Sequence, residues 1–439
     1  MSTTNGVAPE YPETLDAMRP LYAAVVHGSR AGRVQEAFDD VYERRILRGK
    51  EHFSLKKLGA FSVELATLAA FFDRPWEYPS IRLTASAQGW VLNTAGFLLR
   101  ALARLPEAVQ PMRAGLQARI AERNWKQAAR SSGNLSELLL TLGEVAGAVA
   151  VGRESVQLAD RNGDAIERLA SRVALGDALH HAGQREESAM VFGEAEAAQV
   201  EREPWYPRLR SLAGYRYCDL LLGTAEPQDG SGLAGVTSQY RQVCEEVRRL
   251  ASSSIDIAQR NKWLLDIALD QLSLGRAHLG LSITPPPLDL HPVIAYLDQA
   301  VDGLRQSQRV DHLPRGLLAR AAFRRLASDF SGAAADLREA QEIAERGSMR
   351  LHEADAHLEW TRLHLATGDP AAARRHLDRA RDLVRACGYG RREREVTWLE
   401  SRLSSEPGKI LEEIRLRRSF RPAADAPDSS TLLRGDRDR

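Results

Sequence analysis

The chain has 439 residues, of which 44% are hydrophobic and 27% charged, so it can bury a substantial core and remain soluble. Its 60 basic and 59 acidic residues give a formal net charge of +1, which argues against strong non-specific attraction to nucleic acid or to an anionic membrane. Three scattered cysteines without a CxxC pair, no basic-then-apolar leader and no run of 18 apolar residues predict a cytoplasmic protein that does not enter a membrane.

A pattern of 15 residues recurs along the chain, and within runs its period is 40 residues. The copies begin with HGSRAGRVQEAFDDV and occupy 27–41, 98–112, 138–152, 178–192, 323–337 and 363–377. A small or turn-forming residue fills the sixth position (Gly32, Ala103, Gly143, Gly183, Ser328, Gly368), and a small residue fills the eleventh (Ala37, Ala108, Ala148, Ser188, Ala333, Ala373). A fixed period of this size predicts a stack of one supersecondary unit.

Each unit is predicted to be an antiparallel pair of helices. In 165–200, apolar residues recur at helical spacing on both sides of a four-residue break at 182–185. Glycine in the sixth position ends the first helix in the left-handed conformation. The small residue in the eleventh position lets the two helices approach closely.

The remaining segments depart from the period. In chain order, we predict a disordered N-terminus at 1–14, a repeat array at 15–404 and a polar, largely disordered tail at 405–439. Within the array, 53–73 is predicted to be one helix packed on most sides, followed by a loop. The segments 223–235 and 280–292 are predicted insertions that enlarge the turns of two helix pairs, 206–222 with 236–253 and 256–279 with 292–307. A final helix is expected at 391–404.

The pattern of small residues at these two positions, or columns, of the repeat resembles the tetratricopeptide repeat (TPR), which places a small residue in each helix of its unit. Gly96, Ser136, Gly176, Ala321 and Thr361 fill the corresponding position of the first helix, although the units here have 40 residues rather than 34. This resemblance covers about residues 20–400. It implies an all-α fold, a right-handed TPR-like solenoid of helical hairpins.

Three segments, 23–46, 54–77 and 263–280, also resemble repeat arrays at the C-termini of bacterial STAND-type (NACHT or AAA-like) ATPases, in which the repeats are the sensor. The chain has no GxxxxGK[ST] motif, so a separate partner would have to supply an ATPase.

Catalytic and metal sites find little support in the sequence. The segment HEADAH (352–357) spaces two histidines five residues apart, which turns them to different faces of a helix, unlike a zinc-binding HExxH. We therefore interpret them as ordinary helix-surface residues, and we predict no metal or other cofactor and no enzymatic activity. GxSxG is absent as well.

The predicted working surface is the concave groove, because the TPR resemblance implies that the first helices line it. Register assigns the following residues to this groove: Trp90, Asn93, Arg100, Arg130, Glu137, Asp177, His180, Arg276, Arg315, Arg325, Asp355 and Arg362. Four of these arginines (276, 315, 325 and 362) would make its C-terminal half positive and able to hold carboxylates or phosphates. The alternative is that they pair with acidic residues of neighbouring units, notably Asp355 and Glu359.

Three functions remain open on this basis. The first is a non-catalytic scaffold that binds a protein or peptide partner in the groove. The second is a sensor module of a bacterial signalling or defence system that acts with a separate ATPase or protease effector. The third, an enzyme, is the least supported.

Overall fold

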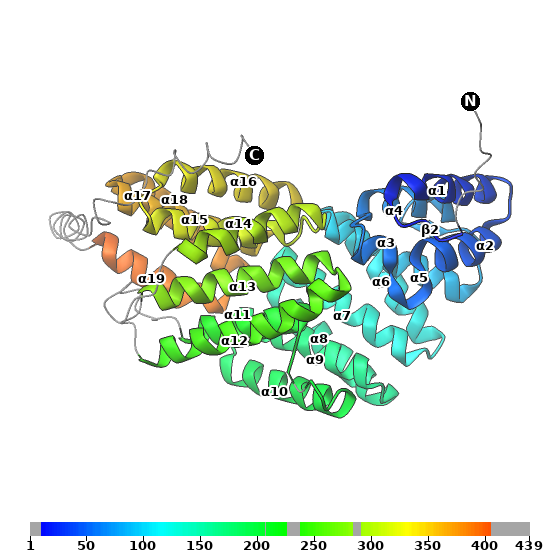
Figure 1. Cartoon of the computed structure of the whole chain (residues 1–439), viewed down its shortest axis with the longest axis horizontal. Coiled ribbons are helices and arrows are strands. Elements are labelled where there is room, and N and C mark those ends of the chain that lie inside the picture. The colour runs from blue at the N-terminus through cyan, green and yellow to red at the C-terminus, as the bar shows by residue number, and fades with distance from the viewer. Residues whose placement is uncertain (1–9, 207, 226–237, 284–290, 405–439) are drawn as a thin grey trace.

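The structure is a computed structural model, which describes residues 10–206, 208–225, 238–283 and 291–404. Helices dominate these residues and lie side by side in successive pairs (Figure 1). Five pairs follow the predicted period: α5 (Ala85–Ala101) with α6 (Leu105–Ala121), α7 (Trp125–Leu142) with α8 (Val145–Asn162), α9 (Ala165–His181) with α10 (Arg185–Arg202), α15 (Leu313–Leu326) with α16 (Phe330–Gly347), and α17 (Arg350–Thr367) with α18 (Pro370–Cys387). The prediction of an all-α repeat fold is confirmed.

The two columns of small residues have the predicted roles. All six residues of the sixth column adopt a positive φ, including Ala103 and Ser328, which have a side chain. All six residues of the eleventh column are at most 5% exposed. The left-handed residue therefore ends each first helix, and the small residue lies where the two helices are closest.

The middle of the array contains α11 (Ser211–Ala225), α12 (Ser238–Asn261), α13 (Leu264–Ile283) and α14 (His291–Gln306). The predicted break between residues 253 and 256 is wrong, because α12 continues to Asn261 and the chain turns at Lys262, which has a φ of 55°. The predicted insertions fall mainly on 226–237 and 284–290, which lie outside the described residues, as do 1–9 and 405–439. The last helix, α19, spans Gly390–Ser404.

The N-terminal region contains α1 (Leu15–Arg30), α2 (Val34–Glu36) and a π-helix, η1 (Ala37–Leu47), followed by the short turn η2 (Gly49–Glu51). The predicted single helix over 53–73 is wrong. The segment divides into α3 (Phe53–Lys56), α4 (Phe61–Leu68), η3 (Ala69–Phe71) and strand β1 (Phe72–Arg74), which pairs antiparallel with β2 (Tyr78–Pro79). The break falls at Gly59, whose φ is +61°, and a Cβ there would lie 2.9 Å from the Gln306 carbonyl oxygen at the end of α14.

A carboxylic acid is buried in this region without an ion-pair partner among the described residues. Glu64 on α4 is fully buried, and the Tyr22 hydroxyl donates a hydrogen bond to its Oε1 atom at 3.3 Å. Burial raises the pKa of Glu64 from 4.5 to about 7, although hydroxyl groups around it oppose the shift. Because the folded state binds this proton more tightly than the unfolded state, Glu64 lowers stability increasingly between pH 4.5 and pH 7.

We therefore expect Glu64→Gln to be near-neutral at pH 4.5 and stabilising at pH 8, by on the order of 3 kcal/mol. Thermal melts of both proteins across this range would measure the difference. Glu36, which is exposed on α2, provides the control, since Glu36→Gln should not produce a gain that grows with pH. Equal pH dependence of wild type and Glu64→Gln would contradict this assignment.

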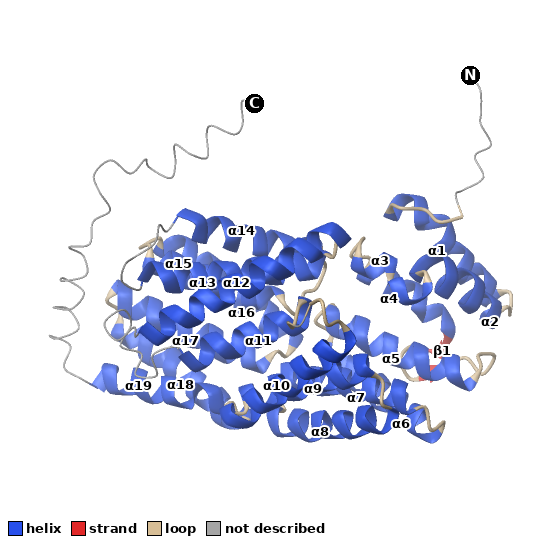
Figure 2. Cartoon of the chain, turned by 60° about the horizontal axis from the view of Figure 1, so that its bottom comes forward, coloured by secondary structure: helices blue, strands red, loops and turns tan. Residues whose placement is uncertain are grey.

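The array closes on itself along a seam, which we define as the contacts of residues 101–103, 143 and 182–183 with residues 311, 347–350 and 387–391. The Asp311 backbone N–H donates to the Ala101 carbonyl at 3.3 Å. A Cβ at Gly143 would lie 2.7 Å from Cys387 Sγ, and one at Gly183 would lie 2.9 Å from the Gly390 carbonyl carbon. The turns within the pairs α5–α6, α7–α8 and α9–α10 thus pack against the turns that connect the late helices α14 to α19. In Figure 2, α5–α10 run along one side of the molecule and α14–α17 lie above them.

Candidate functional site

The first helices of the pairs turn a continuous set of charged and imidazole side chains toward one another. Helix α7 contacts α17, α9 contacts α19, and α11 contacts both α9 and α13. We call these side chains the axial face: Arg100, Glu137, Asp177, His180, His181, Tyr215, Arg216, Asp219, Arg276, Arg309, Asp311, His312, Arg315, His352, Asp355, Tyr389, Arg391 and Arg392.

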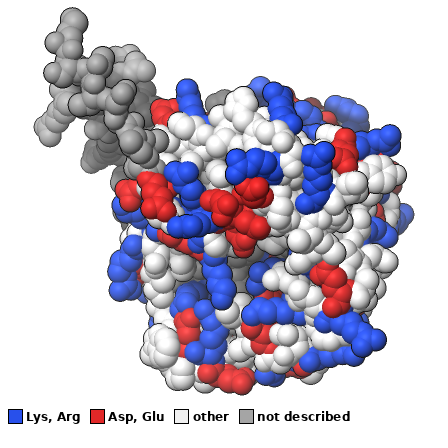
Figure 3. Space-filling model, turned by 90° about the vertical axis from the view of Figure 1, so that its right-hand side faces the viewer, with Lys and Arg blue, Asp and Glu red and all other residues white. Residues whose placement is uncertain are grey.

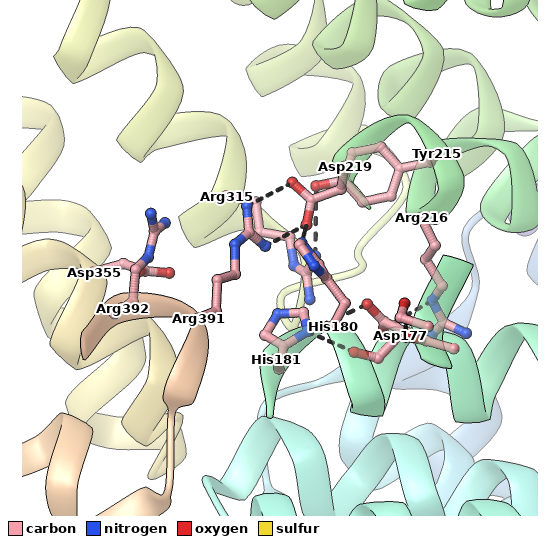
Figure 4. A network of polar contacts seen from close by, with 12 residues as sticks. Asp177, His180, His181, Tyr215, Arg216, Asp219, Arg315, Asp355, Arg391 and Arg392 are labelled. Atoms are coloured by element: carbon pink, nitrogen blue, oxygen red, sulfur yellow. Dashed lines mark hydrogen bonds and ion pairs between the residues drawn. The ribbon is translucent and has the colours of Figure 1, made fainter. Parts of the chain in front are cut away.

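Asp219 on α11 lies at the centre of the axial face (Figure 4). It accepts hydrogen bonds from Arg276 Nη1 and from Arg391 Nη1, both at 2.6 Å. Burial alone would raise the pKa of this carboxyl, but Arg391 and Arg276 outweigh burial and hold the pKa well below its usual range. Asp219 is therefore a buried carboxylate that joins α11, α13 and α19.

Two further carboxylates share one guanidinium. Arg216 on α11 contacts Glu137 at 2.7 Å and Asp177 at 3.2 Å, and Glu137 also pairs with Arg100. Burial opposes ionisation of Glu137, yet Arg216 and Arg100 lower its pKa to about 2. Arg216 and Arg391 likewise lower the pKa values of Asp177 and Asp219, so the network is ionised at neutral pH.

The late helices bring their own partners to the axial face. Arg309 binds Asp311 in a bidentate arrangement, with 2.8 and 2.7 Å between their atoms. Arg392 contacts Asp355 at 2.7 Å. The ring of Tyr389 stacks on that of His181, with 5.6 Å between centroids. The contact of Tyr389 with His181 joins the late helices to the first half of the array.

A second chain of ion pairs continues from the axial face along α15, α17 and α19. Arg325 contacts Glu359 at 2.5 Å, and Arg362 lies between Glu359 (3.1 Å) and Glu395. Glu395 also contacts Arg392 at 2.9 Å. The Arg362 side chain is 32% exposed, whereas those of Arg100 and Asp177 are 4% and 3% exposed. Arg362 is therefore more accessible to solvent than the centre of the axial face.

The structure brings most of the predicted groove residues together, but not along an open groove. Arg100, Glu137, Asp177, His180, Arg276, Arg315 and Asp355 all lie on the axial face, where Arg100, Asp177 and His180 are at most 3% exposed. The expected open trough is wrong for these residues, because the seam brings the late helices across the surface that they would line.

Three of the other predicted groove residues, Trp90, Asn93 and Arg130, lie outside the axial face. Trp90 packs edge-on against Phe38 and Tyr42, with ring centroids 5.3 and 5.9 Å apart, so it belongs to the core of the N-terminal region. Asn93 lies against Gly115 of α6. Arg130 pairs with Glu167 of the next unit, and its side chain is 43% exposed.

The four arginines expected to make the groove positive do not all remain available. Arg276 pairs with Asp219, and Arg325 and Arg362 pair with Glu359, so the ion-pairing alternative holds for these three. Asp355 pairs instead with Arg392. For Arg315, no carboxylate oxygen among the described residues lies within 4.0 Å.

Sequence reasoning missed several residues of the axial face, namely Arg216, Asp219, Arg309, Asp311, Arg391 and Arg392. They lie in α11, between α14 and α15, or in α19, where the repeat register gives no assignment. The interpretation of the HEADAH histidines as surface residues is also wrong. His352 and His357 are 6% and 8% exposed, and they do point to different sides, since His357 Nδ1 lies 2.9 Å from His376 Nδ1 on α18.

Within the described parts of the chain, no group of three or more His, Cys, Asp or Glu side chains has an arrangement that could hold a metal ion. Among those same residues, none of the helices combines the length and apolar character needed to cross a bilayer. On the face shown in Figure 3, basic and acidic side chains are interspersed.

Comparison with known proteins gives a similarity of fold alone. No family model matches the chain, and no curated protein matches it. One solved structure with a similar helical arrangement is a Rap protein complexed with competence and sporulation factor, at 10% identity and a TM-score of 0.43 over 76% of this chain and 99% of that one. Another is a circular tandem repeat protein with a novel repeat topology, at 17% identity and a TM-score of 0.19 over 95% of this chain and 97% of that one. Neither similarity carries information on what this chain binds.

Proposed function

We propose that the chain is a non-catalytic helical-repeat scaffold that binds a protein or peptide partner along the ion-pair chain of α15, α17 and α19. The observation that carries the proposal is the exposure of Arg362 between two carboxylates, next to the buried centre of the axial face. Glu359 also pairs with Arg325, and Glu395 also pairs with Arg392. A carboxylate of the partner can therefore bind Arg362 while both glutamates keep an arginine.

The chemistry of this surface favours a partner segment with acidic side chains. A guanidinium that is only partly buried exchanges one carboxylate for another at little desolvation cost, and it offers bidentate geometry to the new partner. The resemblance to sensor arrays would make a separate ATPase or protease effector the partner.

Capture from a lysate of the native cell, with identification of bound proteins by mass spectrometry, tests the proposal. We expect Arg362→Gln to reduce capture of the partner by at least about tenfold, the effect of losing one charge-assisted pair at an interface. Arg153→Gln is the matched control, because Arg153 on the outer helix α8 also pairs with a glutamate, Glu187, and its side chain is 48% exposed.

Equal capture by both variants would reject this surface as the binding site. Thermal melts should show both variants folded. Reversal of Arg325 and Arg362 to glutamate is a poorer test, because it would place three carboxylates together at Glu359 and lower stability by itself.

A further inference from the structure

Arg315 differs from every other arginine of the axial face. The other six each have a carboxylate oxygen within 4.0 Å: Arg100, Arg216, Arg276, Arg309, Arg391 and Arg392. Arg315 contacts a phenol instead, at 3.5 Å from its Nη1 atom to the Tyr215 hydroxyl, and its Nε atom is buried without a hydrogen-bond partner among the described residues.

The charges of the axial face do not balance. Seven arginines face five carboxylates of the axial face, which are Glu137, Asp177, Asp219, Asp311 and Asp355, and a sixth carboxylate, Glu395, which also contacts Arg392. Asp177 and Asp219 are near enough to Arg315 to raise its pKa, but Arg216 already contacts the first, and Arg276 and Arg391 already contact the second. Arg315 is partly buried and has no direct carboxylate contact among the described residues, an arrangement that favours a further negative charge.

The other unsatisfied groups around Arg315 are also nitrogens. In the part of the chain that the structure describes, His352 Nδ1, His312 Nδ1 and both ring nitrogens of His180 are buried without a hydrogen-bond partner, and these residues are at most 6% exposed. Burial lowers the pKa of each ring, with a further contribution from Arg315 for His352 and His312, so the rings are neutral and each carries one N–H. The N–H groups of these rings and of Arg315 can donate to an acceptor with several oxygens.

Helix geometry adds to the positive potential at the same place. Arg315 lies in the first turn of α15 and His352 in the first turn of α17, and these two helices pack against each other. The N-terminal end of a helix carries a partial positive charge, which favours an anion within the first turn. In Figure 4 the side chain of Arg315 lies beside those of Asp219, Tyr215 and His180.

We propose that Arg315, Tyr215 and His352 form a binding site for an oxyanion, with His180 and His312 as additional donors. The oxyanion is either free inorganic phosphate or the terminal carboxylate of a peptide. This site goes beyond the proposed scaffold function, since an anion can occupy it whether or not a protein partner binds at Arg362.

Thermal melts and isothermal titration of the full chain test the site, with chloride as the reference salt at matched ionic strength. We expect inorganic phosphate at about 100 times its Kd to raise the Tm of the wild type by a few degrees. A short N-acetylated peptide with a free C-terminal carboxylate, compared with its amide, tests the second source. Stabilisation by phosphate alone assigns the site to phosphate, and stabilisation by the free-acid peptide alone assigns it to a carboxylate.

Two variants separate this site from general salt effects. Arg315→Gln should abolish the response to either anion, and in chloride its Tm should equal or exceed that of the wild type, because the substitution leaves no carboxylate unpaired. Arg153→Gln and Arg362→Gln should both retain the response, so loss of partner capture and loss of anion binding remain distinguishable. The proposal is overturned if neither anion raises the Tm of the wild type, or if Arg315→Gln responds as the wild type does.

Discussion

Replacement of Asp219 by alanine is expected to lower the free energy of unfolding by about 3–5 kcal/mol, the largest effect of any single substitution on the axial face. The Arg391 side chain is 7% exposed, and Asp219 is the carboxylate that contacts it. Without Asp219 this guanidinium stays buried and unpaired. Urea unfolding followed by circular dichroism measures the loss.

Two comparisons make the Asp219 prediction specific. Asp302→Ala removes an ion pair with Arg305 whose carboxylate side chain is 74% exposed, so it should cost less than about 1 kcal/mol. Asp219→Ala combined with Arg391→Met should recover part of the loss, since both charges are then absent. A loss as small as that of Asp302→Ala would show that Asp219 and Arg391 are not buried together.

The Asp219 effect also has a defined pH dependence. The folded-state pKa of Asp219 lies well below 3.8, so its contribution to stability is present above that pH and falls away as the pH drops further. Wild type and Asp219→Ala should therefore converge in stability in acid and differ fully at pH 7.

Gly183→Ala is expected to destabilise the chain by about 2 kcal/mol more than Gly368→Ala, although both glycines fill the sixth column of the repeat. Their φ values are +77° and +83°, so alanine adds a similar backbone strain of about 1–2 kcal/mol at each. A Cβ at Gly183 would also lie 2.9 Å from the Gly390 carbonyl carbon across the seam. At Gly368 nothing lies within 4 Å. Overpacking against backbone atoms accounts for the difference.

Unfolding midpoints give the two losses, and hydrogen exchange locates the cause. In Gly183→Ala, amides of α19 should exchange faster than in the wild type, because the seam holds the start of this helix. Gly368→Ala should leave α19 unchanged. Losses of the same size, with unchanged exchange in α19, would argue against the seam.

Local features of the fold were predictable because they depend on residues close together in the chain. The sixth and eleventh columns specify where each first helix ends and where its partner approaches, and both work as expected even at Ala103 and Ser328. The helix expected over 53–73 failed for a tertiary reason, since its break at Gly59 packs against the end of α14. Hydrophobicity alone does not reveal such a contact.

The sequence by itself determined the repeat and its helix pairs. Tertiary structure decided how far the surface of the first helices is covered and which charged side chains form ion pairs. Asp219 and Arg391 are separated by 172 residues, and Arg315 and Tyr215 by 100. A repeat pattern specifies contacts between neighbouring units, whereas closure depends on small rotations summed over all units, including the irregular middle. The summed rotations bring late arginines such as Arg391 to early carboxylates such as Asp219, and among the described residues they leave Arg315 without a carboxylate contact.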